Sequence, residues 1–89
     1  MSSTARNLQI MRNIAANVRR LRERRDLTQA QLAEAAGIAL RYVQVLESGR
    51  GNPSASLIVA LADALGTSPG MLFRAARFEV QRRGRPKGK

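Results

Sequence analysis

The sequence contains neither cysteine nor histidine. The absence of cysteine excludes disulfides and thiolate metal sites, and the absence of histidine removes the commonest general base and metal ligand. The six acidic residues stand singly along the chain and offer no evident carboxylate pair for acid–base catalysis. We therefore expect no catalytic site, no metal, no cofactor and no enzyme activity.

Aromatic residues and long apolar segments are also scarce. One tyrosine and two phenylalanines provide little of the stacking surface with which proteins bind single-stranded nucleic acids, which argues against an RNA-binding module. The longest uninterrupted apolar run covers residues 57–62, far short of a membrane span. Because no signal peptide is evident either, we expect a cytoplasmic protein with no membrane partner.

Positive charge, in contrast, is abundant and unevenly placed. The net charge is +10, and 14 of the 16 basic residues are arginine, whose planar guanidinium suits phosphates and base edges. Residues 1–26 carry seven arginines and two acids, residues 27–73 two arginines and three acids, and residues 74–89 seven basic residues and one acid. Two cationic flanks thus enclose a nearly neutral centre, a pattern typical of nucleic-acid binding but also of a chain from an arginine-rich proteome.

The 89 residues suffice for one small domain, which apolar spacing and capping signals divide into five helices. The first helix ends near residue 25 and has an apolar stripe formed by Ile10, Ile14, Val18 and Leu21. Further helices are expected over about residues 29–36, 40–48, 55–65 and 68–81. No segment has the alternating pattern of a strand, so the expected fold class is all-α.

Local signals mark several helix ends. Thr28 and Gln31 match a capping box at the start of the second helix, and Gly37 suits the left-handed position at its end. Ser54 is placed to cap the fourth helix. The third helix begins after Ala39, which has no side chain able to cap an N-terminus. We therefore expect the third helix to lack about 1 kcal/mol of the stabilisation that a capping Ser or Thr would provide.

Two short helices joined by a glycine-containing turn form a helix-turn-helix unit. Residues 14–73 resemble the Cro/repressor-type (Xre-like) helix-turn-helix family in three segments, VRRLRERRDLTQAQLAEAAGI, VQVLESGRGNPS and LADALG. The family has a four- or five-helix bundle, and with the five helices expected here the resemblance implies a compact five-helix bundle of the lambda-repressor-like type over residues 1–81, with the helix-turn-helix at about residues 28–48. It also implies that the chain binds double-stranded operator DNA as a homodimer.

The third helix is expected to read bases in the major groove. Val43 and Leu46 are placed to face the core, which leaves the opposite face free for a groove about 12 Å wide. Arg41 suits guanine, and Gln44 suits adenine or a phosphate. The expected base-reading residues are Leu40, Arg41, Gln44, Val45 and Ser48, and the expected phosphate-contacting residues are Gln29, Tyr42, Gly49, Arg50 and Asn52.

Two details of this unit leave alternatives open. Leu40 and Val45 stand where the family often has polar base-reading side chains. Three explanations are open for these two apolar residues. They contact thymine methyl groups, they form a patch for a protein partner, or Leu40 folds back on the domain. Arg22 and Glu47 match positions that form a salt bridge in the family and fix the third helix against the first. Two independent surface charges are the alternative.

The fifth helix carries two adjacent apolar stripes, whereas one stripe is enough to cover the core. The spare stripe predicts a homodimer interface, and the alternative is one wide stripe wholly inside the domain. The expected interface residues are Met71, Leu72, Ala75 and Phe78.

The last eight residues, RRGRPKGK, form a basic tail that is expected to extend from the domain. Within it, residues 83–86 resemble the core of an AT-hook, which places arginine in the narrow minor groove of A·T-rich DNA. The expected contact residues of the tail are Arg83, Arg85, Lys87 and Lys89. A general phosphate-attracting tail, an inert tail and a continuation of the fifth helix are the alternatives.

Together these features predict a sequence-specific transcriptional regulator, nucleoid-associated and acting as a repressor, that binds a palindromic operator as a dimer. The alternative is a protein-binding module, such as an antitoxin or anti-regulator. The apolar side chains of Leu40 and Val45 favour the alternative, and the net charge of +10 disfavours it.

Overall fold

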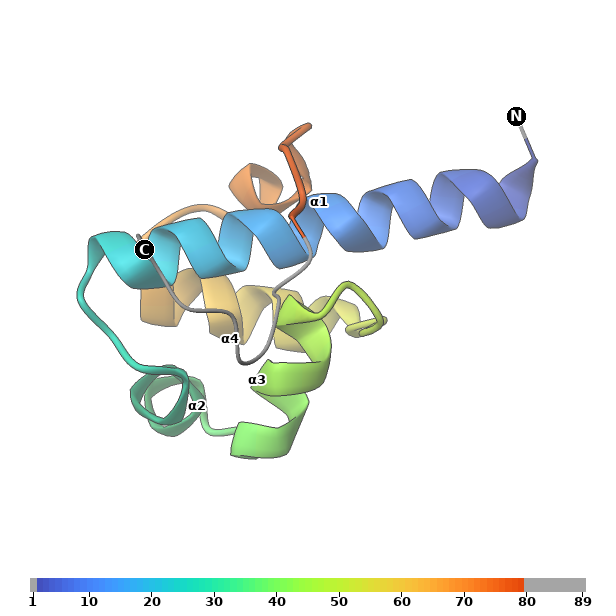
Figure 1. Cartoon of the computed structure of the whole chain (residues 1–89). Helices are drawn as coiled ribbons and strands as arrows, with labels where there is room; N and C mark the ends of the chain where they lie inside the picture. Colours follow the sequence, from blue (N-terminus) through green and yellow to red (C-terminus); the bar gives the residue numbers. More distant parts are fainter. Residues whose placement is uncertain (1, 80–89) are drawn as a thin grey trace, which may run out of the picture.

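The computed structural model describes residues 2–79, and in that range it contains helices but no strand. The elements are α1 (Ser3–Arg24), α2 (Gln29–Ala36), α3 (Leu40–Glu47), α4 (Ala55–Leu65) and the short 3₁₀ helix η1 (Pro69–Phe73). Figure 1 shows the long α1 lying across the other helices, with α2 and α3 together on one side and η1 on the opposite side of α1. The prediction of an all-α fold is confirmed.

The core lies where α1, α2, α3, α4 and η1 meet. Each element contributes apolar side chains that are almost completely buried, which removes them from water and stabilises the fold. The buried cluster consists of Ile14, Val18, Leu32, Ala33, Val43, Leu46, Ile58, Leu61, Ala62, Leu65 and Leu72. The predicted core positions of the third helix, Val43 and Leu46, are both fully buried.

The helix ends follow the local signals closely. The Thr28 hydroxyl accepts from the Gln31 amide at 3.0 Å, and the Gln31 side chain accepts from the Thr28 amide at 2.9 Å, which completes the predicted capping box. Gly37 ends α2 in the left-handed conformation with φ 72°. Ser54 caps α4 through the Leu57 amide, and Ala39 provides no cap for α3, as expected.

The first two turns of α1 extend past the rest of the domain (Figure 1). Leu8 is 41% exposed and Ile10 is 39% exposed. The predicted apolar stripe of the first helix therefore contributes to the core only from Ile14 onward, and Ile10 lies outside the core.

The predicted fifth α-helix is also wrong within the described residues. Only residues 69–73 are helical, in the 3₁₀ form, and Arg74 leaves the helix with an extended backbone at ψ 147°. Residues 75–79 contain no helix or strand. The bundle thus has four α-helices between residues 2 and 79, not five.

The side chains of two buried asparagines on α1 explain this difference. In an α-helix the Leu72 carbonyl would accept from the Ala76 amide. Instead, the Leu72 carbonyl accepts from Asn17 Nδ2 at 3.0 Å, and the Ala76 amide donates to Asn13 Oδ1 at 3.4 Å. Asn17 Nδ2 also donates to the Arg74 carbonyl at 2.8 Å. Side chains from α1 therefore replace the backbone hydrogen bonds that would have continued the helix.

None of the helices within residues 2–79 is long and apolar enough to cross a membrane.

Candidate nucleic-acid interface

Helix α3 presents one face to the core and the opposite face to solvent. Leu40 is 42% exposed, and Arg41, Gln44 and Ser48 are exposed as well, whereas Val45 is half-buried. Four of the five predicted base-reading residues thus share an open surface that includes a guanidinium and a carboxamide. Leu40 does not fold back into the core.

A buried ion pair fixes the last turn of α3 against α1. Arg22 Nε donates to Glu47 Oε2 at 2.7 Å, and Arg22 Nη2 donates to Glu47 Oε1 at 3.0 Å. The two side chains are only 12% and 5% exposed, respectively. The structure therefore brings the predicted pair together in the bidentate geometry that a guanidinium and a carboxylate favour.

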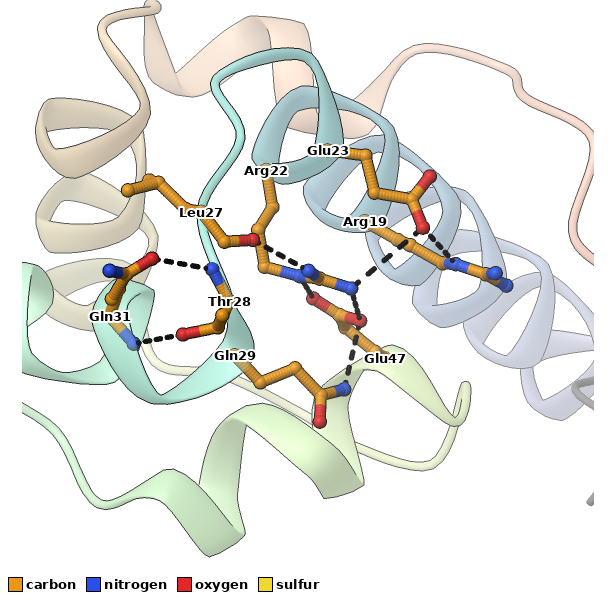
Figure 2. Close-up of polar contacts among 8 residues, drawn as sticks. All are labelled: Arg19, Arg22, Glu23, Leu27, Thr28, Gln29, Gln31 and Glu47. Carbon is orange, nitrogen blue, oxygen red and sulfur yellow. Dashed lines mark hydrogen bonds and ion pairs between the residues drawn. The ribbon is translucent and has the colours of Figure 1, made fainter.

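The ion pair belongs to a network that joins three helices (Figure 2). Gln29 Nε2 donates to Glu47 Oε1 at 3.0 Å, so the first residue of α2 is attached to the last residue of α3. Arg22 Nη1 donates to the Leu27 carbonyl at 2.8 Å, which holds the loop between α1 and α2. Because Glu47 accepts from both helices, one carboxylate sets the orientation of α2 and α3 relative to α1.

The same network acts on the charge of Arg22. The hydrogen bond to Glu47 raises the pKa of the Arg22 guanidinium, and the charges of Glu47 and Glu23 act in the same direction against the opposing effect of burial. Arg22 therefore stays charged at every pH at which a folded protein is ordinarily handled. The network thus retains the positive charge of Arg22 over this pH range.

The predicted phosphate-contacting residues come from three places, namely the start of α2, helix α3 itself and the loop after α3. Gln29 lies at the start of α2, where the capping box occupies the Thr28 and Gln31 amides and leaves the Gln29 and Ala30 amides outside the box. Tyr42 is half-buried on α3. The others form the loop after α3, in which Arg50 and Asn52 are exposed and Gly49 is buried.

The end of α3 is held by its own short-range bonds. The Ser48 hydroxyl donates to the Val45 carbonyl and accepts from Arg50 Nε at 3.1 Å. The Gly49 amide donates to the Leu46 carbonyl at 3.1 Å. Ser48, which we expected to read bases, thus has a hydroxyl that connects the last turn of α3 to the following loop.

The predicted dimer residues do not share one face. Leu72 is fully buried in the core, so its assignment to the dimer interface was wrong. Met71 and Phe78 are half-buried and Ala75 is exposed, and the missing fifth α-helix removes the stripe that was to align them. The tail residues Arg83, Arg85, Lys87 and Lys89 lie outside the described residues.

Sequence reasoning missed the roles of Asn13, Asn17 and the Gln29 side chain. Asn13 is 6% exposed and Asn17 is 1% exposed. A signal for the asparagines was present, because both are polar residues four apart and directly beside the core positions Ile14 and Val18. A buried carboxamide needs partners, and its presence here indicates that another backbone segment crosses α1.

Comparison with known proteins gives a consistent result. Residues 18–72 match the family HTH_3, described as Helix-turn-helix. The chain is 42% identical over 53 residues to the immunity repressor protein of Bacillus phage phi105, covering 60% of this chain and 37% of the phage protein. It is 40% identical over 62 residues to the control protein C.SmaI of Serratia marcescens, covering 68% of this chain and 74% of that protein.

Among solved structures, the restriction-modification controller protein C.AhdI from Aeromonas hydrophila superposes with a TM-score of 0.68 at 35% sequence identity. The superposition covers 71% of this chain and 96% of the controller protein. The chain spans most of both control proteins but little more than a third of the phage repressor.

Proposed function

Because the chain belongs to the HTH_3 helix-turn-helix family, we propose that it is a sequence-specific DNA-binding regulator of transcription, acting as a repressor. The relatives support the class, since they include the immunity repressor protein of a phage, a control protein and a restriction-modification controller protein. In this proposal α3 enters the major groove of double-stranded DNA.

The observation that carries the proposal is the exposed polar face of a helix that is rigidly held from behind. Arg41 and Gln44 lie on the open side of α3, while Glu47 on its other side is fixed by Arg22 and Gln29. A major groove about 12 Å wide admits such a helix. In the groove, an arginine side chain can pair with guanine and a glutamine side chain with adenine. Positioning from behind makes such pairs reproducible.

We expect the phosphate contacts to flank this helix. The start of α2 directs backbone amides and the positive end of its dipole outward, which favours a phosphate near Gln29. Arg50 and Asn52 are exposed in the loop after α3. Gly49 precedes Arg50 in the same loop, and Tyr42 lies on α3 itself. Contacts of this kind fix the register of the protein on DNA without reading its sequence.

The experiment is a measurement of affinity for a site selected from a random duplex library, with fluorescence anisotropy as the readout. Arg41→Ala and Gln44→Ala should each weaken binding to the selected site by about 1–3 kcal/mol and leave random duplex nearly unaffected. Arg24→Ala removes an exposed arginine at the end of α1 and is the charge-matched control. Equal losses on both duplexes for Arg41→Ala would contradict base reading by α3.

We also propose that the chain acts as a homodimer on a palindromic operator. A dimer of helix-turn-helix units reads half-sites about 34 Å apart, one turn of B-DNA. The selected sites should therefore contain an inverted repeat with that spacing. Sedimentation equilibrium that shows a monomer at tens of micromolar protein, both free and bound to the selected site, would exclude the dimer.

A protein-binding function remains the second candidate because Leu40 is 42% exposed on α3. Leu40→Ser separates the two functions. Contact with a thymine methyl predicts that the variant loses affinity only for sites with thymine at one position. A protein patch predicts unchanged DNA binding and loss of a co-purifying partner.

A further inference from the structure

Residues 74–79, which we call the strap, follow η1 in the chain. They cross α1 and reach the loop after α3, where Phe78 lies against Gly49. Figure 1 shows this segment, in red, passing over the middle of α1. Its start is fixed by Asn17, which donates to the Arg74 carbonyl at 2.8 Å, and its middle by Asn13, which accepts from the Ala76 amide. The strap is therefore attached to α1 by buried side chains and is not a free extension of the chain.

The strap ends in an aromatic contact with the loop after α3. The guanidinium carbon of Arg12 lies 5.9 Å from the centre of the Phe78 ring, within the range of a cation–π interaction. A Cβ atom at Gly49 would lie 2.9 Å from Phe78 Cζ, closer than real Cβ contacts allow. The ring thus packs directly on the Gly49 backbone, which any side chain at this position would prevent.

Gly49 also needs to be glycine for its backbone conformation, with φ +87°. On the other side of the same loop, a Cβ atom at Gly51 would lie 2.9 Å from the Cα atom of Leu46. Residues 49–51 are therefore confined between the core side of α3 and the Phe78 ring. Both glycines are buried, whereas Arg50 between them is exposed.

We propose that Phe78 is a positioning residue for the phosphate-contacting loop formed by residues 49–52. This inference rests on the proposed function, in which Gly49, Arg50 and Asn52 contact the DNA backbone. Phe78 is not part of the buried apolar cluster that holds the helices together. Its contact with Gly49 instead limits the movement of a loop in which Arg50 and Asn52 are exposed.

Precise positioning of such a loop matters because binding groups need their geometry held within about 0.5 Å. Arg50 supplies the guanidinium of this loop, and its Nε donates to the Ser48 hydroxyl at 3.1 Å, so a displaced backbone would move this guanidinium away from the phosphate that it contacts. The Arg50 amide donates to the Val45 carbonyl at 3.4 Å, and the Gly49 amide to the Leu46 carbonyl at 3.1 Å. These two amides report directly on whether the loop keeps its place.

The test compares Phe78→Ala with Phe73→Ala in the full chain. Phe73 is 43% exposed on η1, so it offers the same deletion away from the loop. Amide hydrogen exchange of the free protein and affinity for the selected duplex are both measured. For Phe78→Ala we expect faster exchange at the Gly49 and Arg50 amides, an unchanged Leu32 amide, and a loss of affinity of about three- to tenfold.

Phe78→Leu, which keeps an apolar side chain over Gly49, should restore most of the affinity, and Phe73→Ala should change neither readout. The proposal is overturned if Phe78→Ala leaves the Gly49 and Arg50 amides protected, or exposes them without loss of affinity. Faster exchange across all core amides would also overturn it, because Phe78 would then support the fold in general. A wild-type chain that binds no duplex refutes the proposed function, and the exchange data alone then decide whether Phe78 holds the loop.

Discussion

Removing the Glu47 carboxylate tests the central interaction of the structure. Glu47→Ala deprives Arg22 of two hydrogen bonds and Gln29 of one. Breaking a buried ion pair from one side costs about 3–5 kcal/mol. Arg22 keeps its bond to the Leu27 carbonyl and is 12% exposed, so we expect a smaller loss of about 2–3 kcal/mol.

A loss of this size is large for so short a chain. Total stabilities of about 0.05–0.15 kcal/mol per residue correspond to roughly 4–13 kcal/mol for a chain of this length. In a domain of this size, each kcal/mol shifts the melting temperature by about 4–8 °C. The melting temperature of Glu47→Ala should therefore fall by roughly 10–20 °C, measured by far-ultraviolet circular dichroism.

A double-mutant cycle isolates the interaction from the loss of each side chain. Arg22→Ala, Glu47→Ala and the double variant should give a coupling free energy of about 1–2 kcal/mol. The Arg19–Glu23 pair is the matched control, because its N–O distance is 3.1 Å but its side chains are 34% and 54% exposed. For that pair we expect about 0.3–0.5 kcal/mol, reduced further by salt.

The raised pKa of Arg22 fixes the sign of the pH dependence. A cation with a raised pKa contributes stability below its ordinary pKa, and this stability is lost only as the pH rises through the folded-state value. Arg22 should therefore contribute equally at about pH 7 and about pH 9. A coupling free energy no larger than about 0.3–0.5 kcal/mol would refute a buried coupled pair. A coupling free energy that disappears in high salt would refute it as well.

Three further predictions concern other parts of the structure and are tested by thermal or urea unfolding. Asn17→Ala leaves two backbone carbonyls without their donor and should cost about 1–3 kcal/mol; unchanged stability would mean that water replaces the carboxamide. Ala39→Ser supplies the missing cap of α3 and should gain about 0.5–1 kcal/mol, so no gain would place the serine hydroxyl away from the helix amides. Gly49→Ala should cost more than Gly37→Ala, since both have positive φ but only Gly49 meets the Phe78 ring, and the difference should vanish when Phe78 is alanine.

The helix ends were predictable from the sequence because their causes are local. The capping box of Thr28 and Gln31 and the left-handed Gly37 act within one turn of α2, so the letters of that turn contain the whole interaction. The same holds for Val43 and Leu46, whose spacing alone places them on the buried side of α3. The Arg22–Glu47 pair came from family resemblance, since no local pattern relates residues 25 apart.

The fifth helix was not predictable in this way because its end is decided by side chains far away in the sequence. The apolar spacing of residues 71–80 fits a helix, and Pro69 suits its first position. The carboxamides of Asn13 and Asn17 compete for the same backbone groups, across separations of 55 to 63 residues. The resulting strap brings Phe78 to Gly49, a contact that no periodicity within residues 68–81 contains.

The contacts that hold α3 are unevenly distributed along it, with a consequence for the proposed base reading. Its C-terminal end is fixed by Glu47 and by the packing of Phe78 on Gly49, whereas its N-terminal end begins at an Ala39 without a capping bond. An eight-residue helix is about 12 Å long. A tilt of about 10° at the C-terminal end would therefore move Arg41 by roughly 2 Å, more than a bidentate base contact tolerates. Under the proposed function, the fidelity with which Arg41 reads its base is thus set largely by Glu47, which lies near the far end of α3 and faces the protein.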